Sequence, residues 1–136
     1  MLQIAYHSST AGLLSADGIA ALLVASRAKN TLRGITGMFL YKNGDVLQVM
    51  EGENQTVLAL FDVIQADPRH RGVIRLYEKP ILERDFPDWT MGFYDLDAEG
   101  ASTIEGYKDI FGNDSAMRDL KPSAAAKLIA IFRKLR

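Results

Sequence analysis

The sequence predicts an α+β protein with the element order β-α-β-β-α-β-β, a ferredoxin-like arrangement in which two helices cover one face of a sheet. Two patterns predict this order. Apolar residues alternate in several short segments, and they recur at helical spacing in two longer ones. The dipeptide Asn43-Gly44 separates two of the alternating segments, and both of its residues tolerate the positive φ of a hairpin turn. A hairpin flanked by two helices is typical of this fold.

Five segments are expected to form strands. In chain order they are residues 2–7, 34–41, 45–50, 73–82 and the segment that begins at residue 89. Trp89, Met91 and Phe93 alternate in the last of them, as the period of a strand requires. Residues 8–14, after the first strand, are expected to form a loop.

Both helices have capping signals at their first residues. Ser15 or Asp17 can cap the first helix, which is expected to run to about Lys29. Asn54 can cap the second helix, which is expected to end near Asp67-Pro68 because a residue before proline avoids helical geometry.

The C-terminal part is expected to be helical. Residues 1–97 are predicted to form one domain, and residues 98–136 an extension that packs on it. A short helix is expected near residues 104–111, and a longer one after Pro122. An apolar stripe on the longer helix comprises Leu128, Ile131, Phe132 and Leu135. We expect this stripe to cover the sheet face that the first two helices leave bare.

Composition excludes several classes of protein. The chain has 136 residues, of which 48% are hydrophobic and 24% are charged, and this fits one soluble domain. The net charge of −1 gives no field that favours nucleic acid or acidic membranes, so neither is expected as a partner. There is no cysteine and there are two histidines, so no metal site is expected. The absence of a signal peptide or long apolar run indicates a cytoplasmic protein.

Three neutral polar side chains fall where periodicity predicts burial. Ser26 and Asn30 continue the apolar stripe of the first helix, and Gln48 lies inside a strand. Burying such a group without a partner costs about 1–3 kcal/mol. Each alone could make a hydrogen bond within the core, but together with Tyr6 they form a neutral cluster. Such a cluster suits the edge of a planar heterocycle and does not suit acyl or phosphoryl transfer.

Five short motifs also occur in a fixed order. They are Tyr6-His7-Ser8, Asn30 followed by Ile35-Thr36-Gly37, Gln48 to Gly52, Asp67-Pro68-Arg69-His70, and Trp89-Thr90-Met91. This ordered set resembles the BLUF family (sensors of blue light using FAD) across residues 1 to about 97. The resemblance implies a blue-light photoreceptor that signals by changing hydrogen bonds and is not an enzyme.

The resemblance also implies a flavin held without a covalent bond between the two helices. FAD is expected, with FMN or riboflavin as alternatives. Tyr6 would donate an electron and a proton through Gln48, whose amide would change its orientation or tautomer. Trp89 or Met91 would relay the change along the fifth strand. The expected flavin-binding residues are Ser8, Leu22, Ser26, Lys29, Asn30, Ile64, Asp67, Arg69 and His70.

Nothing after residue 97 resembles a cyclase, a phosphodiesterase or a DNA-binding module. The resemblance therefore implies that output passes to an unidentified partner protein or through a homo-oligomer. Two alternatives remain open. One is a small ferredoxin-like hydrolase of the acylphosphatase kind, although the segment after the first strand, Ser8 to Gly12, lacks the arginine of a phosphate loop. The other is a binding module that has lost its flavin.

Overall fold

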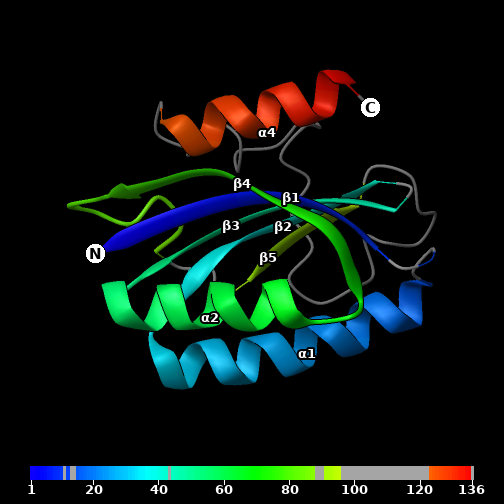
Figure 1. Cartoon of the computed structure of the whole chain (residues 1–136), viewed down its shortest axis with the longest axis horizontal. Helices are drawn as coiled ribbons and strands as arrows, with labels where there is room; N and C mark the ends of the chain where they lie inside the picture. Colours follow the sequence, from blue (N-terminus) through cyan, green and yellow to red (C-terminus); the bar gives the residue numbers. More distant parts are fainter. Residues whose placement is uncertain (11, 13–14, 43, 88–90, 96–122, 136) are drawn as a thin grey trace.

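The computed structural model describes residues 1–10, 12, 15–42, 44–87, 91–95 and 123–135. Its elements follow the predicted order and include the helix predicted after Pro122 (Figure 1). They are β1 (Leu2–Thr10), α1 (Ala16–Arg33), β2 (Thr36–Lys42), β3 (Asp45–Gly52), α2 (Asn54–Ala66), β4 (His70–Pro80), β5 (Gly92–Asp95) and α4 (Ala124–Leu135). The predicted α+β, ferredoxin-like fold class is confirmed.

The described strands form one sheet in the order β4-β1-β3-β2-β5. Neighbouring strands are antiparallel except β5, which pairs in parallel with β2. Helices α1 and α2 lie on one face of the sheet, and α4 lies on the other (Figure 1). The central pair, β1 and β3, places Tyr6 directly opposite Gln48. The register of these two strands therefore brings together two residues that are far apart in the chain.

Both faces of the sheet carry an apolar core. Ile4 and Tyr6 belong to the core beneath α1 and α2, whereas Ala5, Leu47 and Val49 belong to the core beneath α4. Successive side chains of a strand point to opposite faces, so a strand covered on both sides is apolar at nearly every position. This explains why residues 2–6 of β1 are all buried.

Helix α4 covers the second face, but the face it presents differs from the predicted one. Ala125, Ile129 and Phe132 are buried against the sheet, and Leu128 packs partly beside them. Ile131 is 49% exposed, so its predicted burial is wrong. Apolar residues occupy adjacent positions along this helix, so periodicity alone did not select the buried face. The side chain of Leu135, the predicted helix at 104–111 and the boundary at 97 and 98 lie outside the described residues.

Several predicted boundaries shift in the first half of the chain. β1 continues to Thr10, whose backbone N–H donates to the Gly44 carbonyl at 2.8 Å, so Ser8 is a strand residue and not a loop residue. Helix α1 runs past Lys29 to Arg33. Ser15 is its cap, because its hydroxyl accepts from the Gly18 N–H at 3.0 Å.

Three further boundaries also differ from the predictions. Asn54 is the first residue of α2 and not its cap, because the Glu53 carboxylate accepts the N–H groups of Gln55 and Thr56. β4 begins at His70, three residues before the predicted start. β5 begins at Gly92, so Met91 precedes the strand, and Trp89 lies outside the described residues.

Two glycines are required by the backbone. Gly34 ends α1 at φ 67°, a left-handed conformation that favours glycine. Gly37 in β2 lies so close to β3 that a side chain there would collide with the Val49 carbonyl. The Ile35-Thr36-Gly37 motif therefore has a structural reason for its last residue.

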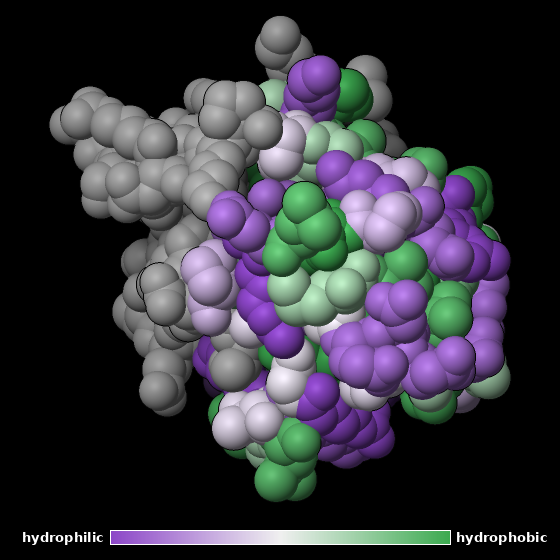
Figure 2. Space-filling view, turned by 90° about the vertical axis from the view of Figure 1, so that its left-hand side faces the viewer, coloured by the Kyte–Doolittle hydropathy of each residue, from purple (hydrophilic) through white to green (hydrophobic). Residues whose placement is uncertain are grey.

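The surface of the described residues is mixed in character. Figure 2 shows hydrophobic residues in separate patches among hydrophilic ones. Leu32 and Leu82 are almost fully exposed, at 88% and 98%. Scattered apolar groups are ordinary on protein surfaces and do not by themselves mark a partner site. Among the described helices, none has the length and apolar character needed to cross a membrane.

A row of polar side chains crosses the α4 face of the sheet near one end. Gln3, Glu51 and Thr36 lie opposite one another on β1, β3 and β2. The fully buried Glu51 carboxylate accepts from Gln3 Nε2 at 2.9 Å and from Thr36 Oγ1 at 2.8 Å. It also accepts the backbone N–H groups of Asp85 and Phe86, at 3.0 and 2.9 Å. Glu51 therefore ties the chain after β4 to the middle of the sheet.

Replacing Glu51 with leucine is expected to lower the free energy of unfolding by about 3–5 kcal/mol, because it leaves several buried donors without an acceptor. Urea denaturation followed by circular dichroism measures this loss. The matched control is Glu78→Leu, which removes a partly exposed ion pair with Arg75 and should cost at most about 1 kcal/mol. Equal losses in the two variants would contradict the structural role of Glu51.

Candidate functional site

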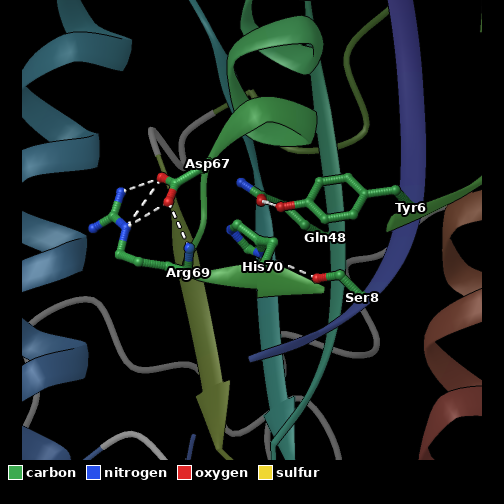
Figure 3. Close-up of polar contacts among 6 residues, drawn as sticks. All are labelled: Tyr6, Ser8, Gln48, Asp67, Arg69 and His70. Carbon is green, nitrogen blue, oxygen red and sulfur yellow. Dashed lines mark hydrogen bonds and ion pairs between the residues drawn. The ribbon is translucent and has the colours of Figure 1, made fainter. Parts of the chain in front are cut away.

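Tyr6 and Gln48 form a hydrogen-bonded pair in the core beneath α1 and α2. The Tyr6 hydroxyl donates to Gln48 Oε1 (Figure 3). The amide nitrogen, Gln48 Nε2, donates to the sulfur of Met91 at 3.6 Å. Burial raises the pKa of Tyr6 far above its ordinary value, and the negative charge of Asp67 adds to the effect. Tyr6 is therefore a neutral phenol that keeps its proton on the oxygen facing the amide.

A cavity of about 140 Å³ lies beside this pair, between α1 and α2. Most of the predicted site residues line it: Leu22, Ser26, Lys29, Asn30, Gln48, Ile64, Asp67, Arg69, His70 and Met91. Arg33, Phe39, Leu60 and Val63 line it as well. The structure thus brings together residues from α1, α2, the strands β2, β3 and β4, and the turn after α2.

The lining has aliphatic walls, a neutral polar interior and a basic rim. Leu22 of α1 and Ile64 of α2 contribute the aliphatic walls, and both pack against the core. Asn30 is buried, as its place on the helical stripe predicts, and Ser26 is half-buried one turn before it. Lys29 is exposed at the rim. This combination suits a ligand with a flat apolar body, a polar edge and an anionic tail.

The turn from α2 into β4 brings Asp67, Arg69 and His70 to the cavity. The Asp67 carboxylate accepts the backbone N–H of Arg69 at 2.8 Å, and the Asp67 carbonyl accepts that of His70 at 3.1 Å. The Arg69 guanidinium donates to the same carboxylate at 2.6–3.1 Å (Figure 3). These hydrogen bonds lower the pKa of Asp67 to about 2. Asp67 and Arg69 thus bind each other in this structure, and their predicted contacts with a ligand remain predictions.

His70 connects the cavity to β1. Its ring atom Nδ1 lies 2.9 Å from the Ser8 hydroxyl (Figure 3). Burial lowers the pKa of His70, and the nearby Asp67 opposes this effect. Ser8 and Tyr6 are themselves absent from the cavity lining. Each of them contacts a lining residue instead, Ser8 through His70 and Tyr6 through Gln48.

Sequence reasoning missed five residues near the site. Arg33 follows Lys29 by one helical turn, but the predicted end of α1 excluded it. Phe39 faces Gln48 across β2 and β3, so alternation could have found it. Leu60 and Val63 lie one turn or less before Ile64 on α2. The fifth, Arg27, donates to the Met91 carbonyl, and no local signal indicates a contact 64 residues away.

The comparison with protein families identifies the type of domain. The profile of the BLUF family, described as sensors of blue-light using FAD, matches residues 1–92. The chain belongs to the BLUF family. The predicted membership is therefore confirmed, and with it a domain type that binds flavin and senses blue light.

Solved BLUF structures resemble the chain in fold and in sequence. The dark-state structure of the BLUF protein BlrB is 35% identical, with a TM-score of 0.65 over 69% of this chain and 71% of BlrB. BlrP1 of Klebsiella pneumoniae is 29% identical, with a TM-score of 0.76 over 97% of this chain and 32% of BlrP1. A further BlrP1 structure contains FMN and cyclic diGMP.

Curated relatives are much longer proteins. The beta subunit of photoactivated adenylate cyclase from Euglena longa is 33% identical over 89 residues, which are 65% of this chain and 10% of that protein. The corresponding subunit from Euglena gracilis is 32% identical over the same share. This BLUF chain thus spans about a tenth of the length of the curated relatives it matches. The comparisons give no support to the acylphosphatase alternative.

Proposed function

We propose that this chain is a blue-light receptor domain that binds FAD between α1 and α2, signals through a changed surface and catalyses no reaction itself. The observation that carries the proposal is the buried Tyr6–Gln48–Met91 chain of hydrogen bonds at the edge of the cavity. A phenol, an amide and a thioether have no base or activated nucleophile among them. They suit a rearrangement of hydrogen bonds better than a hydrolysis.

The residues at the cavity fit a flavin. Asn30 and Gln48 offer neutral amides to the polar edge of an isoalloxazine ring, which alternates carbonyl and N–H groups. Leu22 and Ile64 would pack on the ring faces. Lys29, together with Arg33, would hold the phosphates of FAD or FMN, which riboflavin lacks. Both flavin nucleotides fit this arrangement, and FAD follows the family.

A bound flavin supplies the absorption of blue light and an excited state that accepts an electron. Tyr6 would give up that electron and its hydroxyl proton would move toward Gln48, the group that it already contacts, and both would return to Tyr6 as the excited state decays. The Gln48 amide then changes its orientation or tautomer. Its donor end is no longer directed at the Met91 sulfur as in this structure. Met91 directly precedes β5, so the change reaches the edge of the sheet.

Output through another protein is the second part of the proposal. BlrP1 and the photoactivated cyclases are several times longer than this chain, so their BLUF-like parts belong to larger signalling proteins. We propose that this domain acts on a partner protein in the cytoplasm and forms a homo-oligomer. Trp89 would contribute to the relay beside Met91, as the family pattern implies.

The test is the absorption spectrum of the purified chain after incubation with FAD, in the dark and under blue light. The protein is expected to be yellow and to show a reversible red shift of the flavin band. Parallel titrations with FMN and riboflavin measure the contribution of the phosphates. A protein that binds none of the three flavins would refute the proposal, and a colourless protein with acylphosphatase activity would favour the alternative.

A further inference from the structure

We propose that Arg27 is a positioning residue that holds Met91 beside Gln48 and so sets how fast the receptor returns to its dark state. This inference rests on the proposed function, because only a receptor that photocycles has a rate of return. Arg27 lies on α1 between the cavity residues Ser26 and Asn30. Its guanidinium donates through Nε and Nη2 to the Met91 carbonyl, at 3.1 and 3.0 Å.

The backbone at Met91 has little else to hold it among the described residues. β5 has four residues, and it lies at the edge of the sheet beside β2. The pairing with β2 begins at Gly92, opposite Met38, so Met91 stands just before the ladder. A guanidinium that directs two N–H groups at one carbonyl makes a stronger and more directional contact than a neutral donor. Arg27 therefore fixes the point at which the chain enters β5.

Met91 makes contacts with both Gln48 and Arg27. The Met91 side chain is 3% exposed, and its sulfur accepts from Gln48 Nε2, while its carbonyl accepts from Arg27. A continuous chain of contacts thus runs from Tyr6 on β1 through Gln48 and Met91 to α1. The amide at its centre is the group expected to change in the light. Arg27 is placed to favour the arrangement in which Met91 faces the amide.

The direction of the effect follows from this geometry. When the amide changes, Met91 loses the donor on its sulfur, whereas Arg27 still holds its carbonyl in the place that suits the dark arrangement. Removing Arg27 removes this bias, so the return to the dark state becomes slower. For Arg27→Gln we expect recovery about tenfold slower than in the parent, which corresponds to about 1.4 kcal/mol in the activation free energy. Arg27→Lys keeps the charge but cannot direct two N–H groups of a planar guanidinium at one carbonyl. Its recovery rate should therefore lie between those of the parent and Arg27→Gln.

The experiment measures the decay of the red shift after a pulse of blue light. Flavin content and the size of the initial shift should stay at the parent level in Arg27→Gln, because Tyr6 and Gln48 are intact. The matched control is Lys127→Gln, which removes the same charge from an exposed position on α4 and should recover like the parent. A second readout is hydrogen exchange of residues 91–95 in the dark, which should be faster in Arg27→Gln than in the parent or the control.

A double variant tests whether Arg27 acts through the Met91 side chain. In a Met91→Ala background the sulfur is absent, so adding Arg27→Gln should not slow recovery further. If Arg27→Gln slowed recovery as much in the Met91→Ala background as in the parent, the inference would be overturned. Recovery of Arg27→Gln at the parent's rate would also overturn it. If Arg27→Gln lost its flavin, the decay of the red shift would be measured in Arg27→Lys instead. Hydrogen exchange of residues 91–95 at the parent's rate in both Arg27→Gln and Arg27→Lys would also overturn the inference. A parent with no red shift would instead refute the proposed function.

Discussion

Gln48→Leu is expected to bind flavin and to show no red shift under blue light. Leucine has a similar volume but neither donor nor acceptor, so it cannot exchange one hydrogen-bond arrangement for another. In the wild-type structure the two ends of the amide have different partners, the Tyr6 hydroxyl and the Met91 sulfur. That asymmetry is what a rotated or tautomerised amide would reverse. Light-minus-dark absorption spectra at equal flavin content measure the result.

The matched control for this variant is Gln55→Leu. Gln55 is an exposed residue near the start of α2, and it does not line the cavity beside the Tyr6–Gln48 pair. The control should give the normal shift, which shows that the loss in Gln48→Leu comes from the position and not from the change of residue type. A normal shift in Gln48→Leu itself would refute the role assigned to the amide.

Tyr6→Phe is expected to bind flavin and to fail to photocycle. The change removes the hydroxyl that keeps its proton at the Gln48 oxygen, and phenylalanine supplies neither the proton nor an easily lost electron. The fold should survive, since the ring still packs against Phe61 and the loss of one buried hydrogen bond costs about 1–2 kcal/mol. Repeated light pulses with absorption detection measure the fraction of protein that cycles.

Tyr41→Phe provides the comparison for Tyr6→Phe. Tyr41 is a second buried tyrosine in the same core, on β2. Its variant should cycle, because the hydroxyl that contacts Gln48 is still present. If Tyr6→Phe cycled like the wild type, the electron would have to come from another residue, with Trp89 the first to examine.

The sequence by itself determined the element order, the family and most of the cavity lining. The element order, the family motifs and the burial of single residues depend on patterns within short segments, and such patterns are visible in the sequence alone. The stripe of α1 predicted the burial of Asn30, and the apolar neighbours of Gln48 in β3 predicted its burial in the same way. The ordered motifs then identified the BLUF family, and the family match over residues 1–92 confirms it.

Only the tertiary structure decided which groups touch across long distances. Ile129 and not Ile131 faces the sheet, because the contacts of α4 with strands more than seventy residues earlier select one of two equally apolar faces. Arg27 reaches the Met91 carbonyl for a similar reason, since the pairing of β5 with β2 determines where Met91 lies. The sequence also left open which residue stands beside Gln48, and the described residues place Met91 there. Local periodicity indicates which side of an element is apolar. The specific residue that a side chain contacts is determined only when the strands pair and the helices pack on the sheet.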